Sequence, residues 1–138
     1  MGPRVRRADW PRLLAEALRA AETRPFAWGS HDCATWAFDL ARDLTGGDDV
    51  AALWRGRYRT GAGAARVMRR LGWQDLEAMG RDLLGAPLST PRLAQRGDLV
   101  LGGTPPAFGV SAGARAVFVG PQGLVSLPID ACPLAWRI

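Results

Sequence analysis

The feature that most constrains the fold of this chain is a change of hydrophobic pattern at Gly97. Before Gly97, apolar residues recur at spacings of three and four, which is the period of an amphipathic helix. After Gly97, short runs rich in Val and Leu are bounded by Gly or Pro, a pattern typical of strands joined by tight turns. Helices followed by consecutive strands predict an α+β fold, in which N-terminal helices pack on a small antiparallel sheet formed by the C-terminal third.

Caps and breakers place the predicted elements along the chain. Asp9 is expected to cap the first helix, with Pro11 in its first turn. Ser30 or Asp32 is expected to cap the second helix, which a pair of glycines ends. Helices are predicted over residues 9–21, 32–44, 48–56, 59–72 and 74–84, and strands over residues 98–103, 107–113, 115–120, 123–128 and 134–138, the last at a sheet edge.

The length of 138 residues fits one domain with one hydrophobic core. Within it we distinguish a helical extension (1–24), a helical half that contains Cys33 (25–96) and an antiparallel meander (97–138). No apolar run approaches the roughly 20 residues that span a bilayer. The N-terminal arginines are not followed by the apolar segment of a secretory signal. We therefore expect no membrane span and no signal peptide.

The net charge of +5 comes from 18 basic residues, all of them arginine. A basic balance is compatible with nucleic acid or with another anionic surface. The chain lacks the alternation of basic and aromatic residues that single-strand binding surfaces use, so we predict no nucleic-acid partner. Most of the arginines are scattered, and three small clusters of arginine stand out in the sequence: Arg4, Arg6 and Arg7; Arg55, Arg57 and Arg59; and Arg69 and Arg70.

Cys33 is the candidate nucleophile, because it begins a predicted helix. The positive end of a helix dipole and free backbone amides favour a thiolate, and the amide of Cys33 itself is suited to an oxyanion hole. His31, the only histidine, lies two residues earlier, so it needs a special turn to serve as the base. The alternatives are that Cys33 is a small buried apolar residue and that His31 is a loop residue bonded to backbone.

The chain shows no pattern of a metal or cofactor site. Cys33 and Cys132 form no CxxC pair, and a single histidine does not complete an ordinary zinc site. The glycine-rich stretches GAGAAR and LGGTPP match neither common phosphate-binding motif. We therefore expect no metal and no cofactor.

Two motifs together resemble a known family. WGSHDC supplies Trp28, Gly29 and Asp32 just before or at the start of a helix, and RGDLVLGG supplies Gly97 and Asp98 at the start of the meander. With the following AFGVSAG strand, residues 25–138 resemble the NlpC-type papain-like cysteine peptidases, which cut cell-wall peptides. The pattern is most similar to a small phage- and prophage-encoded branch of unassigned function found among tail genes. The resemblance implies a single papain-like domain.

Carried over to this chain, the resemblance assigns the nucleophile to Cys33 and a fold-shaping role to Asp98. It places the base of the family at Ala107, which cannot transfer a proton. The third, orienting polar residue is expected on residues 115–120, where only Arg115 is polar. His31 is left as a substitute base. Loss of the base typically costs several orders of magnitude in rate, so the resemblance implies a scaffold that has lost hydrolysis.

We therefore expect a structural or assembly protein of a phage-type tail, at the tail tip, located in the virion tail and assembled in the host cytoplasm. Its partners are then other tail proteins in a multi-subunit assembly, with peptidoglycan as a further candidate, and contacts are expected at residues such as Trp54 and Arg57. The alternative is an active cysteine hydrolase that cleaves peptidoglycan peptides with Cys33. A third possibility is a domain that binds a small ligand in the former cleft.

Overall fold

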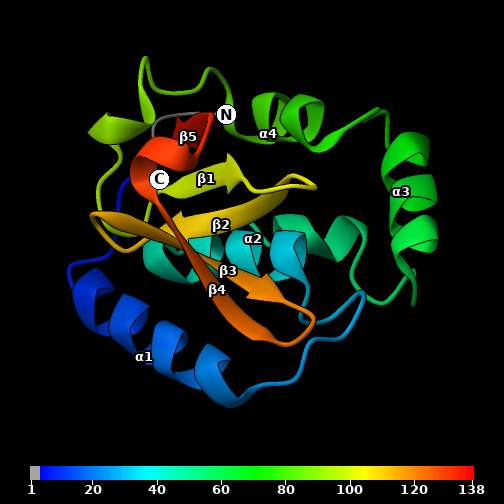
Figure 1. The fold of residues 1–138 in the computed structure, drawn as a ribbon, viewed down its shortest axis with the longest axis horizontal. Coiled ribbons are helices and arrows are strands. Elements are labelled where there is room, and N and C mark those ends of the chain that lie inside the picture. The colour runs from blue at the N-terminus through cyan, green and yellow to red at the C-terminus, as the bar shows by residue number, and fades with distance from the viewer. Residues whose placement is uncertain (1–3) are drawn as a thin grey trace.

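The computed structural model describes residues 4–138 and has an α+β architecture, with four α-helices and a five-stranded antiparallel sheet (Figure 1). This confirms the predicted fold class. The helices are α1 (Trp10–Thr23), α2 (Cys33–Thr45), α3 (Gly61–Arg70) and α4 (Leu76–Leu84), and the 3₁₀ turns are η1 (Val50–Leu53), η2 (Pro91–Leu93) and η3 (Ile129–Ala131). The strands are β1 (Leu99–Gly102), β2 (Ala107–Ser111), β3 (Arg115–Gly120), β4 (Gly123–Pro128) and β5 (Leu134–Trp136).

The strands form a meander whose last member returns to the first. The order is β4-β3-β2-β1-β5, and every neighbouring pair is antiparallel. Leu99 of β1 pairs with Val110 of β2 on one side and with Trp136 of β5 on the other. The edge position predicted for the last strand is therefore confirmed.

Predicted and observed elements differ mainly at one segment. Residues 48–56, predicted to be a short helix, contain only the 3₁₀ turn η1. Asp9 lies at the N-cap position of α1 as predicted, but its side chain caps no backbone amide. Its carboxylate instead forms ion pairs with Arg7 and Arg12, at 3.2 and 2.9 Å.

The main core lies between α2 and one face of the sheet. Phe38 of α2 packs edge to face against Phe108 of β2 and Trp54, with ring centroids 5.2 and 5.6 Å apart. Trp54 is fully buried, and its indole N–H donates to the Thr35 hydroxyl. The expectation that Trp54 lies at an assembly contact is therefore wrong.

Because strand side chains alternate between faces, β1 and β3 also support a second, smaller core on the other side of the sheet. Its buried members are Val100, Ala116, Phe118, Cys132 and Ala135. The residues packed against it come from the irregular crossing before β1, from Ala107 at the start of β2 and from the β4–η3 region. Both faces of the sheet are therefore covered, with α2 on the larger side.

Asp98 holds the start of the sheet to both ends of the described chain. Its buried carboxylate lies 2.6 Å from Arg6 and accepts hydrogen bonds from the backbone amides of Gln95 and Ile138 at 2.8 and 2.9 Å. Gly97 precedes it at φ +92°, with Arg6 and Leu44 both 3.0 Å from where a Cβ would lie. Residues 96–98, the RGD of the second motif, thus form a crowded junction. This explains why a glycine stands at position 97 and a buried aspartate at position 98.

We predict that Asp98→Asn lowers the free energy of unfolding by about 3 kcal/mol, because it leaves the Arg6 charge without its buried partner. Urea denaturation measures this change. Asp130→Asn is the matched control, because it breaks an ion pair with Arg92 that is exposed to solvent. Equal stability losses in the two variants would contradict a special role for Asp98.

Candidate functional site

The N-terminus of α2 is built by Asp32. Its carboxylate accepts a hydrogen bond from the Thr35 amide at 2.9 Å, which makes Asp32 the N-cap and decides between the two predicted caps. The same carboxylate accepts from the Gly29 amide at 2.8 Å and from the Tyr58 hydroxyl at 2.7 Å. The buried Asp32 carboxylate thus accepts three hydrogen bonds, and its role is to hold these three segments together.

The turn before α2 explains the glycine of the WGSHDC motif. Gly29 adopts φ +84°, and a Cβ there would lie 2.6 Å from the carbonyl oxygen of Tyr58. Only glycine fits this position without movement of the backbone. Its neighbour Trp28 is 41% exposed and packs edge to face on Phe26 and Tyr58. The motif therefore brings a partly exposed indole beside the start of the helix.

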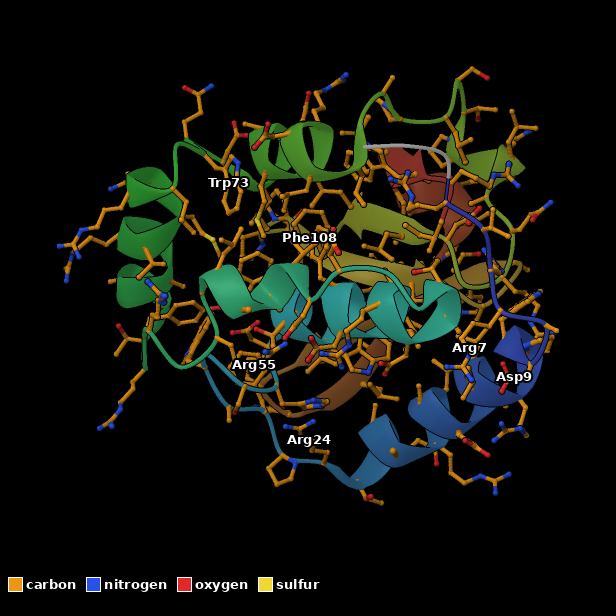
Figure 2. All side chains as sticks on the ribbon, turned by 180° about the vertical axis from the view of Figure 1, so that it is seen from behind. Arg7, Asp9, Arg24, Arg55, Trp73 and Phe108 are labelled. Atoms are coloured by element: carbon orange, nitrogen blue, oxygen red, sulfur yellow. The ribbon has the colours of Figure 1, made fainter. Side chains whose placement is uncertain are left out.

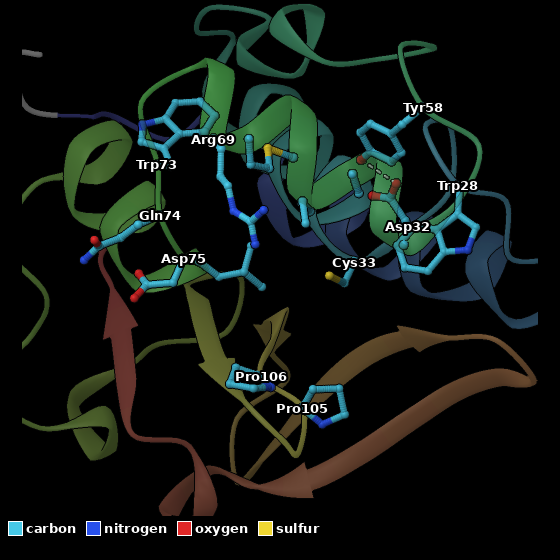
Figure 3. Close-up of a pocket in the computed structure, with 16 residues that line it drawn as sticks. Trp28, Asp32, Cys33, Tyr58, Arg69, Trp73, Gln74, Asp75, Pro105 and Pro106 are labelled. Carbon is cyan, nitrogen blue, oxygen red and sulfur yellow. Dashed lines mark hydrogen bonds between the residues drawn. The ribbon is translucent and has the colours of Figure 1, made fainter.

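Cys33, the first residue of α2, lines a cavity of about 370 Å³ (Figure 3). Most of the wall is apolar and comes from Trp28, α3, Leu76 and the loop before β2. Arg69 enters the cavity from α3 (Figure 3). Gln74 and Asp75 lie near one end, and Asp32 and Tyr58 also line the cavity (Figure 3). This is a cleft for a largely apolar ligand with a few polar contacts.

Burial raises the pKa of the Cys33 thiol to about 11. Hydrogen bonds from the backbone of Phe108 and from the first residues of α2 act in the opposite direction, and the nearby Asp32 charge adds to the rise. Loss of hydration thus outweighs the helix N-terminus, which is the reverse of the thiolate stabilisation expected from the sequence. At neutral pH the side chain is a protonated thiol.

Ala107 opens β2 directly before Phe108, the residue whose backbone hydrogen-bonds the Cys33 thiol. The backbone at the start of β2 therefore lies close to Cys33. The methyl group of Ala107 itself packs against the smaller core, on the other side of the sheet. On β3, the polar Arg115 is exposed and bonds to Ser126, so it does not orient a base.

His31 lines a different cavity, of about 220 Å³, which also contacts Arg24 and Trp36. The side chain is 2% exposed, and neither ring nitrogen has a hydrogen-bond partner among the described residues. Only the backbone of His31 is bonded, to that of Ala27. Burial, followed by the Arg24 charge, lowers the pKa of His31. The structure therefore does not bring His31 and Cys33 into one cavity.

The two cysteines are separated by the sheet. Cys132 belongs to the smaller core, whereas Cys33 packs beside the main core. Both are free thiols.

Sequence analysis did not single out Tyr58 and Arg69 as parts of the site. Tyr58 is the only tyrosine in the chain, but nothing in its spacing connects it to Asp32, 26 residues earlier. Arg69 follows the ordinary period of an amphipathic helix. Both reach the cavity only through the tertiary fold.

In the described part of the chain, residues 4–138, no three His, Cys, Asp or Glu side chains lie together in a way that suits a metal ion. Over the same residues, no helix has the length and apolar character that crossing a membrane requires.

Comparison with protein families gives one match, over residues 5–138, to the family described as "Domain of unknown function (DUF6950)". The chain belongs to this family. A comparison with curated proteins gives no match. The DUF6950 match covers both motifs, the cavity and the sheet.

We predict that His31 makes this DUF6950 domain less stable in mild acid. A lowered pKa means that the unfolded chain takes up a proton at a pH where the folded chain does not. Stability is therefore lost as the pH falls below the ordinary value near 6.5, at a rate of at most about 1.4 kcal/mol per pH unit for one proton.

Urea denaturation at pH values above and below 6.5 measures this loss, with His31→Leu as the comparison. The variant lacks the titrating group, so its stability should fall less than that of the wild type over the same interval. Parallel pH profiles of the two proteins would contradict the prediction.

Proposed function

We propose that this protein is a structural or assembly component of a phage-type tail, at the tail tip, and that it uses the scaffold of an NlpC-type papain-like peptidase without its hydrolytic activity. The observation that carries the proposal is that Cys33 begins α2 beside an apolar cleft, whereas Ala107, the residue to which the resemblance assigns the base, has only a methyl group as its side chain.

The other groups near Cys33 do not replace the missing base. Hydrolysis by a cysteine needs a thiolate and a donor for the leaving amine. The three hydrogen bonds to Asp32 occupy its carboxylate, and burial beside that carboxylate raises the pKa of Tyr58. Arg69 is a permanent cation and accepts no proton. The cavity is therefore better suited to binding than to proton transfer.

The resemblance to the branch found among tail genes supports a place in a virion tail. In that setting the partners of this protein are other tail proteins. The exposed Trp28 beside the cavity is a suitable contact residue, because partly exposed tryptophans are frequent among interface hot spots. Peptidoglycan is the second ligand class for the same cleft.

An active cysteine hydrolase is the second candidate. It is favoured by one observation, the thiol at the N-terminus of α2 in a cleft of substrate size. In that case the base must come from a rearrangement or from the substrate itself, because the described residues place no imidazole in the cavity.

Incubation with purified peptidoglycan separates the two candidates. We predict that the wild type releases no more new amino and carboxyl ends than Cys33→Ser does, as measured by mass spectrometry of the soluble fragments. In the encoding phage, Cys33→Ser should leave the yield of infectious tails unchanged, whereas deletion of the chain abolishes it. Fragment release that depends on Cys33 would overturn the proposal in favour of the hydrolase.

A further inference from the structure

The segment from η1 to the start of α4 carries a concentrated positive charge. Residues 50–74 contain six arginines and no acidic residue. One of them, Arg55, is neutralised by ion pairs with Asp39 and Asp49 at 2.5 and 2.8 Å. The remaining five have no acidic neighbour in their own segment.

These five arginines are exposed, and none forms an ion pair or a side-chain hydrogen bond with another residue in the described range 4–138. They are Arg57, Arg59, Arg66, Arg69 and Arg70, and we call them the arginine surface. Elsewhere in the molecule, Arg12 of α1, Arg42 of α2, Arg81 of α4 and Arg92 of η2 are paired with carboxylates. The unpaired positive charge of these five arginines is therefore concentrated on α3 and on the segment just before it.

The arginine surface adjoins the Cys33 cavity. Helix α3 stands at one end of the molecule with its outer side facing solvent (Figures 1 and 2). Its inner side gives the cavity a wall of small residues, among them Gly61, Ala64 and Ala65. Arg69 belongs to both features, because its side chain lines the cavity (Figure 3). On the same helix, Arg66 lies three residues before Arg69 and Arg70 follows it directly.

We propose that the arginine surface and the Cys33 cavity together bind one acidic polypeptide segment that carries an apolar side chain. The apolar side chain enters the cavity beside Trp28, and carboxylates of the segment pair with Arg66, Arg69 and Arg70. Guanidinium groups form two parallel hydrogen bonds with a carboxylate, and clusters of arginine are a recurring means of reading acidic motifs. This proposal rests on the proposed function, since it treats the cleft as a binding site for a partner protein.

The composition of the cavity favours a polypeptide over a nucleic acid. Single strands bind to a series of exposed aromatic rings on which successive bases stack. Here Trp28 is exposed, whereas Tyr58 and Trp73 are buried at 6% and 5% exposure. The cavity wall is mostly apolar and includes the cation Arg69 as well as the carboxylates of Asp32 and Asp75. It therefore suits an aliphatic or aromatic side chain, while the carboxylates of the segment lie outside it against Arg66, Arg69 and Arg70.

The test uses the full chain and a fluorescent peptide in which runs of glutamate flank a central Leu-Phe pair. Fluorescence anisotropy should show saturable binding. The double variant Arg66→Gln/Arg70→Gln should weaken it by about tenfold or more, as should replacement of the glutamates by glutamine. Arg19→Gln/Arg96→Gln is the matched control, because it removes the same charge from two other exposed arginines, and it should bind like the wild type.

The role of the cavity is tested separately. Ala65→Trp, made at an exposed position of α3 that lines the cavity, should weaken the peptide by about tenfold, as should serine in place of the Leu-Phe pair. Equal affinity for the serine peptide, or tighter binding of a single-stranded DNA of matched charge, would overturn the proposal. Mass spectrometry of the same mixtures detects cleavage of the peptide. Cleavage that requires Cys33 would overturn the proposed non-hydrolytic function. If the peptide neither binds nor is cleaved, only the present proposal is overturned.

Discussion

The structure of the site depends on the hydrogen bonds of one buried carboxylate, that of Asp32. It caps α2, holds the Gly29 turn and anchors Tyr58, so three separate segments meet at the residue before Cys33. A buried charge is retained only where donors replace its hydration, and here three of them do so. The same arrangement that fixes the position of Cys33 also places a negative charge beside it, which raises the pKa of the thiol.

Two physical effects compete at Cys33, and their balance decides the chemistry. The helix N-terminus stabilises a thiolate by a modest amount. Burial in an apolar cleft disfavours the charged form and raises the pKa of a fully buried thiol by as much as several units. An imidazolium ion near the thiol would shift this balance, but Ala107 at the start of β2 supplies no charge. The result is a cleft with the geometry of a nucleophile site and the electrostatics of a binding pocket.

The sequence predicted the parts of this molecule that depend on local periodicity and caps. The α+β class, the five strands and the start of α2 at Asp32–Cys33 followed from such signals. It did not predict the pKa of Cys33 or the separate cavity of His31, because burial is decided by residues distant in the chain. The same holds for Tyr58 and Arg69, which reach the site only through tertiary contacts.

The central claim is that burial leaves Cys33 protonated and that Ala107 supplies no base to offset it. The rate at which an electrophile alkylates Cys33 tests this claim most directly. Mass spectrometry would follow that rate from about pH 6 to about pH 10 in the wild type and in Ala107→His. We predict a wild-type rate that still rises at the upper end, in keeping with a thiol pKa of about 11, and a faster reaction of the variant near neutrality. A wild-type rate that levels off below the ordinary thiol pKa near 8.5 would contradict the account, because it would show a thiolate that needs no added base.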